Sequence, residues 1–215
     1  MEEELIELGS PTASKRVILL HGLTGTASVI RPVAEYLCKR LGEDYSFLLP
    51  TAPIIKVKQF NGEPAHAWFD VKSSDFRREA DIDGIFESSD RIASLVRNEI
   101  SQGVSPKDIY LGGFSQGGVI ALTTALLEPF AVAGVFAFSS YLPLEDQLTS
   151  RMTDVSKDVP IFQAVSLKDE FISQEMSDKA SAFLRNRGNP VLIQNYEKQT
   201  GGFYQRTMNG ESYRS

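Results

Sequence analysis

Histidine and cysteine are scarce in this chain of 215 residues, which contains two histidines and one cysteine. A disulfide needs two cysteines, so Cys38 cannot form one within the chain, and this favours a reducing compartment such as the cytoplasm. The same scarcity leaves no histidine and cysteine spacing that is typical of a metal site. We therefore expect a cytoplasmic protein with no metal ion and no organic cofactor.

The chain also lacks a long basic run and a long hydrophobic run. Its formal net charge is −6, from 22 Lys and Arg against 28 Asp and Glu, which disfavours nucleic acid or an anionic membrane as a partner. Residues 1–8 (MEEELIEL) are acidic, unlike the basic start of a secretory signal. No apolar stretch approaches the length of a membrane span. We expect neither a nucleic-acid-binding nor a membrane-spanning protein.

Segments typical of strands and of helices alternate along the chain, and they predict a mostly parallel sheet with helices on both faces. The predicted strands are residues 16–20, 45–49, 109–111, 132–138, 159–165 and 191–196, and the predicted helices are residues 26–41, 81–102, 116–127 and 173–186. Residues 50–80 show no clear period, and a loop of that length in a compact domain is usually functional. The length fits a single domain over residues 1–215.

A sequence typical of a nucleophilic serine lies between a predicted strand and a predicted helix. Residues 112–118 read GGFSQGG and contain the pattern G-x-S-x-G around Ser115. In this context the serine occupies a tight strand-to-helix turn, and the helix N-terminus directs backbone N–H groups at a developing oxyanion. The alternative is an ordinary glycine-rich turn capped by a serine. We favour the nucleophile.

Residues 17–28 (VILLHGLTGTAS) are expected to supply the second half of an oxyanion hole. The backbone amide of Leu23 would pair there with that of Gln116. His21 lies in the same loop, and we expect its ring to hydrogen-bond to backbone and shape the turn rather than to act in catalysis.

Together these segments resemble the acyl-protein thioesterase, carboxylesterase and lysophospholipase family of small α/β-hydrolases. The resemblance rests on LLHGLTGT (19–26), LLPTAP (48–53), AWFD (67–70), DIDGIFESSDRI (81–92), GGFSQGG (112–118) and FSSYLP (138–143). It implies an α/β-hydrolase fold and hydrolysis of a carboxylic ester or thioester. The substrate would be a small-molecule or lipid acyl ester, and possibly an acylated protein.

The resemblance also implies an acyl-binding role for the loop from residue 53 to residue 68. Its apolar side chains include Ile54, Phe60 and Trp68. The same loop could serve as a flap that covers the core, and the two roles are compatible.

The acid of the family's triad corresponds to Asp169, in AVSLKDEFIS (164–173). Asp169 would orient and charge-stabilise a catalytic imidazole. The segment departs from the family pattern, because Val165 and Ser166 replace the usual His-Gly pair. A solvated loop carboxylate is the alternative, and Glu170 is a second candidate for the acid.

The catalytic histidine of the family has no counterpart in this sequence. Its position, shortly after the last strand, falls at about Gly201, and the closing helix that should follow is missing after about residue 200. We expect its loss to expose apolar surface on one sheet face and to promote association or instability. His66 could replace the base only if a ring nitrogen lay within about 3 Å of the serine hydroxyl; a surface histidine that contacts substrate is the other interpretation.

The sequence therefore predicts a serine ester or thioester hydrolase that is impaired by the lack of its base. A protein that keeps its other catalytic elements but loses one triad member retains about 10³- to 10⁴-fold catalysis over water. The alternative is a non-catalytic acyl-binding protein, or a truncated or frameshifted product. The choice between oxygen ester, thioester and lysophospholipid, the acyl chain length and the oligomeric state are left open by the sequence.

Overall fold

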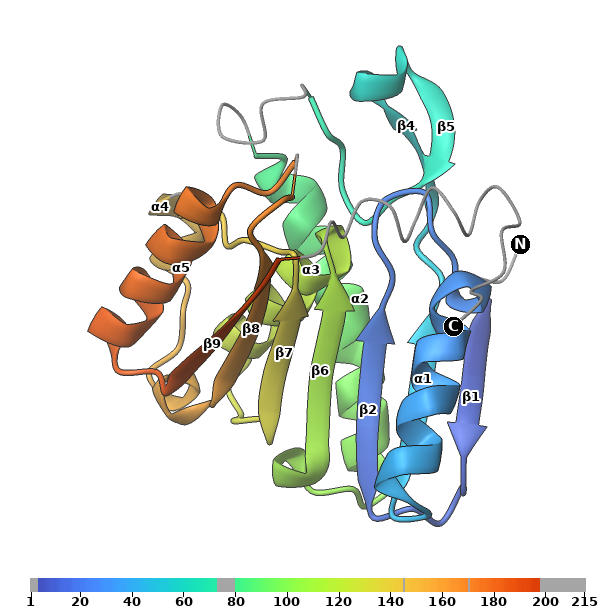
Figure 1. Ribbon diagram of the computed structural model, residues 1–215. Helices are drawn as coiled ribbons and strands as arrows, with labels where there is room; N and C mark the ends of the chain where they lie inside the picture. Colours follow the sequence, from blue (N-terminus) through green and yellow to red (C-terminus); the bar gives the residue numbers. More distant parts are fainter. Residues whose placement is uncertain (1–3, 73–79, 145, 170, 198–215) are drawn as a thin grey trace.

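A seven-stranded sheet organises the molecule (Figure 1). The computed structural model describes residues 4–72, 80–144, 146–169 and 171–197. In spatial order the strands are β1 (Leu5–Gly9), β3 (Tyr45–Pro50), β2 (Lys15–Leu20), β6 (Ile109–Phe114), β7 (Gly134–Phe138), β8 (Ile161–Ser166) and β9 (Val191–Tyr196). Only β1 is antiparallel to its neighbour, so the predicted mostly parallel sheet is confirmed.

Helices lie on both faces of this sheet (Figure 1). The first face is packed against α1 (Ala27–Leu41) through side chains such as Val17, Leu19 and Phe47. The opposite face carries α2 (Ile82–Ser101), α3 (Gln116–Leu127) and α5 (Gln174–Arg187), and its core includes Ile18, Leu20 and Leu111. Short helical turns complete the structure: α4 (Asp146–Thr149), η1 (Lys58–Phe60), η2 (Pro106–Asp108) and η3 (Val155–Asp158).

The helix ends follow from local chemistry that the sequence shows directly. Asp81 caps α2 by accepting a hydrogen bond from the Gly84 amide, and Ser173 caps α5 by accepting one from the Met176 amide. Gly188 ends α5 with a φ of 113°, a conformation that glycine adopts without strain. None of the helices in the described part of the chain is long and apolar enough to cross a bilayer.

Two features of the fold were absent from the sequence-based prediction. Residues 50–80 contain a hairpin of β4 (Ile54–Val57) and β5 (Glu63–His66), and β1 adds an edge strand beside β3. All three strands have four or five residues and lie at an edge, and of their side chains only Val57 is fully buried. Strands this short give a weak periodic signal. The predicted loss of a closing helix after residue 200 lies outside the described residues.

A buried asparagine fixes the connection from α5 to β9. The Asn189 side-chain amide donates hydrogen bonds to the carbonyl oxygens of Ser156 (2.7 Å) and Val159 (3.2 Å). Its own oxygen accepts one from Arg187 Nη1 at 3.0 Å. The turn before the last strand is therefore tied to η3 by groups that have little access to water.

We predict that Asn189→Ala lowers the free energy of unfolding by about 1–3 kcal/mol, because it removes the amide donor from two buried carbonyl groups. Gln194→Ala is the matched control, since Gln194 is an exposed amide on the adjoining strand. Chemical denaturation followed by circular dichroism measures both variants. Equal stabilities would contradict the role assigned to Asn189.

Candidate active site

Ser115 occupies a strained turn between β6 and α3. Its φ of 52° and ψ of −119° lie in a region that L-residues rarely adopt. The backbone is held on both sides: the Ser115 amide donates to the Phe138 carbonyl at 2.9 Å, and Ser140 Oγ donates to the Ser115 carbonyl at 2.9 Å. The Ser115 hydroxyl makes no hydrogen bond with any residue in the described ranges. The turn thus presents a partly exposed hydroxyl with no base hydrogen-bonded to it in the described part of the chain.

Glycines permit this turn to pack against the end of β2. A Cβ on Gly117 would lie 2.5 Å from the carbonyl oxygens of Leu20 and His21. A Cβ on Gly113 would lie 2.2 Å from the backbone carbon of Gly117. Both contacts are with backbone atoms, which cannot rotate away, so a larger residue would displace the whole turn.

The two predicted oxyanion-hole amides belong to segments that meet at Ser115. Gln116 is the first residue of α3, and a Cβ on Gly22, next to Leu23, would lie 3.4 Å from the Ser115 Cβ. Within the part of the chain that the structure describes, neither the Leu23 nor the Gln116 N–H has a hydrogen-bond acceptor. Unpaired N–H groups at a helix N-terminus are suited to an anionic oxygen.

The Gln116 side chain has a second role that the sequence analysis missed. It is buried, accepts a hydrogen bond from the Trp68 amide at 3.1 Å and donates one to the Phe69 carbonyl at 2.9 Å. Ser140 was also missed, although it belongs to the FSSYLP block. Both side chains act through tertiary contacts with the backbone, which no local pattern reveals.

His21 is a buried, neutral side chain that shapes the loop. Its Nδ1 donates to the Gly22 carbonyl at 2.7 Å, and its Nε2 accepts from the Ala52 amide at 2.9 Å. Burial lowers the pKa of His21 from 6.5 to about 4, against a smaller raising effect of the bond to Gly22. Both ring nitrogens are engaged, so His21 has no free site for a proton.

His66 ends β5 and lies beside the same loop. Its Nδ1 is 2.7 Å from the Ala52 carbonyl, and its own carbonyl accepts a hydrogen bond from the Thr24 amide at 2.8 Å. Donation from Nδ1 leaves Nε2 as the nitrogen that could accept a proton. His66 forms no hydrogen bond with Ser115 in the structure.

Asp169 follows β8, at the same carboxyl edge of the sheet as Ser115 after β6. One of its carboxylate oxygens accepts hydrogen bonds from the amides of Phe171 and Ile172, both at 2.9 Å. Glu170, the second candidate for the acid, lies outside the described residues. So does Gly201, where the base would fall.

The three predicted acyl-binding residues have different environments. Ile54 is 57% exposed, whereas Trp68 is only 3% exposed and its indole N–H donates to the His21 carbonyl at 2.8 Å. Phe60 is partly buried against a small cluster of Val57, Ala67 and Val71, which Leu23 also contacts. The hairpin is thereby packed onto the loop that carries a predicted oxyanion amide.

No group of three His, Cys, Asp or Glu side chains among the described residues is arranged to hold a metal ion.

A sequence profile of the phospholipase/carboxylesterase family matches residues 1–210. The chain belongs to this family. Members of the family found by sequence include acyl-protein thioesterase 1 of Mycosarcoma maydis, 35% identical over 82% of this chain and 77% of the relative. The corresponding protein of Saccharomyces cerevisiae is 32% identical over 86% of this chain and 82% of the relative. Carboxylesterase SOBER1 of Arabidopsis thaliana is 27% identical over 80% of this chain and 76% of the relative.

Solved structures share the fold of this family member. Arabidopsis thaliana SOBER1 superposes with a TM-score of 0.81 at 24% identity, covering 86% of this chain and 90% of that chain. Zea mays acyl-protein thioesterase 2 superposes with a TM-score of 0.76 at 21% identity, covering 97% of this chain and 98% of that chain. The α/β-hydrolase fold is therefore confirmed, and the relatives are esterases and thioesterases.

We predict that Gly117→Ala destabilises this phospholipase/carboxylesterase family member by about 1–3 kcal/mol, because the new methyl group would overlap two backbone carbonyl groups. Gly134→Ala is the control, since its Cβ would meet no atom closer than 3.4 Å. Urea unfolding of both variants provides the measurement. A Gly117→Ala variant as stable as Gly134→Ala would show that the turn can shift freely.

We predict a pH-dependent stability that arises from His21. The folded state resists protonation down to about pH 4, whereas an unfolded histidine takes up a proton near pH 6.5. The His21 contribution is therefore complete above pH 6.5 and is lost as the pH falls from 6.5 to 4, by about 3 kcal/mol in total. Unfolding free energies of the wild type and of His21→Gln at several pH values test this. The carboxylates contribute equally to both proteins, so parallel pH profiles would contradict the assignment.

Proposed function

We propose that this chain binds acyl esters or thioesters at Ser115 and hydrolyses them slowly. The observation that carries the proposal is the strained turn at Ser115 in a member of an ester-hydrolase family, beside two backbone N–H groups that have no acceptor among the described residues. Ser115 is the nucleophile, and the amides of Leu23 and Gln116 are the donors to the oxyanion. Asp169 is the acid, although in the described residues it has no imidazole to orient.

In the proposed reaction, Ser115 Oγ attacks the carbonyl carbon and the negative charge moves to the carbonyl oxygen. The N–H groups of Leu23 and Gln116 stabilise that oxygen. Collapse of the tetrahedral intermediate expels the alcohol or thiol, and water then releases the acid from the acyl-serine. The serine proton must leave during attack, and solvent water is the acceptor where no side chain takes it. This step limits the rate.

The acyl chain would lie along the β4–β5 hairpin. Ile54 and Phe60 offer apolar surface there, and the hairpin packs on Leu23 beside the oxyanion donor. Trp68 is buried, and its indole N–H bonds to the His21 carbonyl in the loop before Leu23. Because the relatives include acyl-protein thioesterases, we include lipid and protein acyl thioesters among the proposed substrates.

A second candidate function is acyl binding without turnover. It is favoured by one observation: the Ser115 hydroxyl has no hydrogen-bond partner among the described residues. His66 is the described side chain that could replace the base, through its Nε2. The two functions share one binding site and differ only in whether a proton acceptor reaches Ser115.

We predict that the chain hydrolyses a short-chain p-nitrophenyl ester faster than Ser115→Ala, and that free imidazole raises this Ser115-dependent rate by about tenfold or more, because it supplies the missing base. Ser115→Ala should show only the background effect of imidazole. His66→Ala should leave the unassisted rate within about twofold if His66 is not the base.

Three other outcomes are informative. A wild-type rate equal to that of Ser115→Ala with and without imidazole would contradict hydrolysis, and acyl binding would then stand alone. A high rate without imidazole that His66→Ala abolishes would assign the base to His66. A high rate that survives His66→Ala would place a base outside the described residues.

A further inference from the structure

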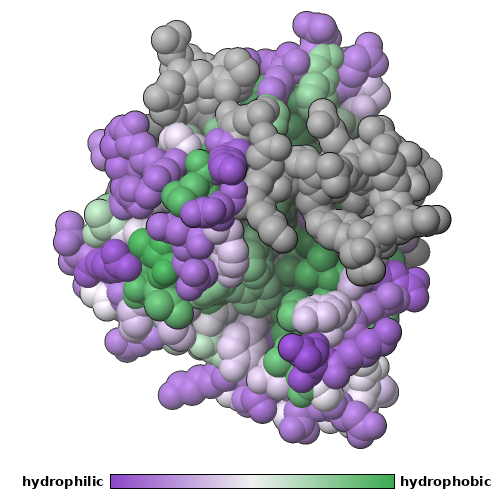
Figure 2. Space-filling view, in the orientation of Figure 1, coloured by the Kyte–Doolittle hydropathy of each residue, from purple (hydrophilic) through white to green (hydrophobic). Residues whose placement is uncertain are grey.

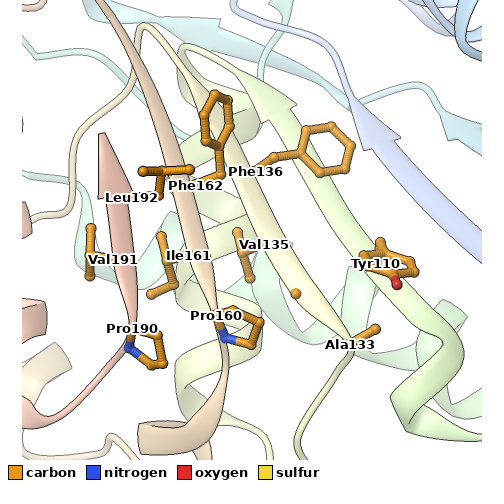
Figure 3. A pocket seen from close by; sticks show the side chains of 11 residues that line it. Tyr110, Ala133, Val135, Phe136, Pro160, Ile161, Phe162, Pro190, Val191 and Leu192 are labelled. Carbon is orange, nitrogen blue, oxygen red and sulfur yellow. The ribbon is translucent and has the colours of Figure 1, made fainter. Parts of the chain in front are cut away.

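The two faces of β8 differ in chemical character. Phe162 lies along an apolar depression on one face of the sheet, together with Leu192 of β9 (Figure 3). Hydrophobic residues gather near the middle of this side of the molecule (Figure 2). Gln163, the next residue of β8, projects to the opposite face, because successive side chains of a strand alternate. There it accepts a hydrogen bond from Ser181 of α5, so buried polar contacts join the sheet to this helix.

A second buried serine of α5 lies one helical turn before Ser181 and is directed at the candidate active site. The Ser177 hydroxyl donates a hydrogen bond to the Ser140 carbonyl at 3.1 Å. Ser177 is 1% exposed and Ser140 is 2% exposed. In an environment this poor in water a hydrogen bond is electrostatically stronger than at the surface. Ser177 therefore ties α5 to the segment that follows β7.

The segment after β7 holds the Ser115 backbone on both sides. The Phe138 carbonyl accepts from the Ser115 amide, and Ser140 Oγ donates to the Ser115 carbonyl, both at 2.9 Å. Ser140 also packs directly on the first turn of α3, because a Cβ on Gly118 would lie 2.6 Å from both its Cβ and its Oγ. A backbone with a φ of 52° persists only where its neighbours hold it, so a displacement of Ser140 would loosen Ser115.

The same segment needs support of its own. Ser139 has a φ of 43°, in the region that L-residues rarely adopt. Its amide donates a hydrogen bond to the Ala164 carbonyl of β8 at 2.8 Å. The next residue, Ser140, is held by the hydroxyl of Ser177. Contacts from β8 and from α5 therefore both fix the course of the chain beside the candidate nucleophile.

We propose that Ser177 is a positioning residue for the nucleophile: its hydroxyl holds Ser140, and Ser140 holds the Ser115 backbone in the conformation that presents Oγ to the substrate. This inference rests on the function proposed above for Ser115. Ser177 acts through these two hydrogen bonds, so its loss changes the rate of attack and leaves substrate binding unchanged. Displacing a reacting group by about 1 Å can cost about 10²-fold in rate, and a loosened turn is expected to react about tenfold more slowly.

Steady-state hydrolysis of a short-chain p-nitrophenyl ester at a fixed concentration of imidazole tests the proposal with Ser177→Ala. We expect kcat of the Ser115-dependent reaction to fall about tenfold, while KM stays within about twofold because the binding surface is intact. Ser181→Ala is the matched control, since Ser181 is a buried serine of the same helix that bonds to Gln163 and to the Ser177 carbonyl. Its kcat should stay within about twofold of the wild type.

The two α5 variants are matched in stability as well as in position. Each substitution removes one buried hydroxyl donor, so we expect similar losses in the free energy of unfolding. Alanine is a strong helix former and is smaller than serine, so both variants should fold. Urea unfolding followed by circular dichroism verifies the match.

A double-mutant cycle with Ser140→Ala shows whether Ser177 acts through Ser140. Ser140→Ala removes the bond to the Ser115 carbonyl, and it should lower kcat at least as much as Ser177→Ala does. Adding Ser177→Ala to Ser140→Ala should lower kcat by no more than about twofold further, because the link to Ser115 is already broken. Independent effects that multiply in the double variant would contradict the proposed coupling.

Amide hydrogen exchange measured by NMR tests the positioning without a substrate. The Ser115 amide, which is bonded to the Phe138 carbonyl, should exchange at least about tenfold faster in Ser177→Ala than in Ser181→Ala, since a loosened segment opens that bond locally. The Leu122 amide, in the middle of α3, should exchange at similar rates in the two variants.

Equal falls of kcat in Ser177→Ala and Ser181→Ala would overturn the proposal, because a general loss of stability would explain both. Unchanged kcat and unchanged exchange in Ser177→Ala would overturn it as well. A wild type no faster than Ser115→Ala would contradict the proposed function instead, and the exchange rates would then decide alone. A faster Ser115 amide in Ser177→Ala only would uphold the positioning of the turn, and equal rates in both variants would overturn it.

Discussion

The close packing of the Ser115 turn against the end of β2 is the constraint on which the rest of the site depends. The carbonyl oxygens of Leu20 and His21 leave no room for a side chain at Gly117. This contact brings the loop of Gly22 and Leu23, which follows β2, beside the Ser115 turn, which follows β6. The positive φ of Ser115 is the local cost of that approach, and the bonds from Phe138 and Ser140 hold it.

Hydrogen bonds between uncharged groups connect this turn to the neighbouring segments. His21 uses both ring nitrogens on backbone groups, Trp68 bonds to the His21 carbonyl, and Gln116 holds the backbone at Trp68 and Phe69. These bonds join the nucleophile turn, the oxyanion loop and the start of the segment toward α2. The proposed oxyanion donors are thus held in place without a substrate, which is the condition for electrostatic stabilisation of a developing charge.

The sequence predicted the main elements well because their signals are local. The bounds of α3 and β9 agree with the prediction, and α2 differs by one residue at each end. The hairpin of β4 and β5 was not predicted, because its strands are short and half exposed. Ser115 could be singled out as the candidate nucleophile from its glycines and its neighbours in the chain. The roles of the Gln116 side chain and of Ser140 could not, since each depends on a partner more than 20 residues away.

The proposed nucleophile and oxyanion donors, with no base hydrogen-bonded to Ser115 among the described residues, predict a site that reacts slowly. Intact-mass spectrometry after exposure to an alkyl fluorophosphonate measures this most directly, because the reagent labels a serine only in proportion to its activation. We expect a single adduct on Ser115 that forms over hours and is absent from Ser115→Ala. Complete labelling within seconds would reveal a base, and no labelling of Ser115 would show that the turn is not a nucleophile site. Either result would contradict slow hydrolysis at Ser115.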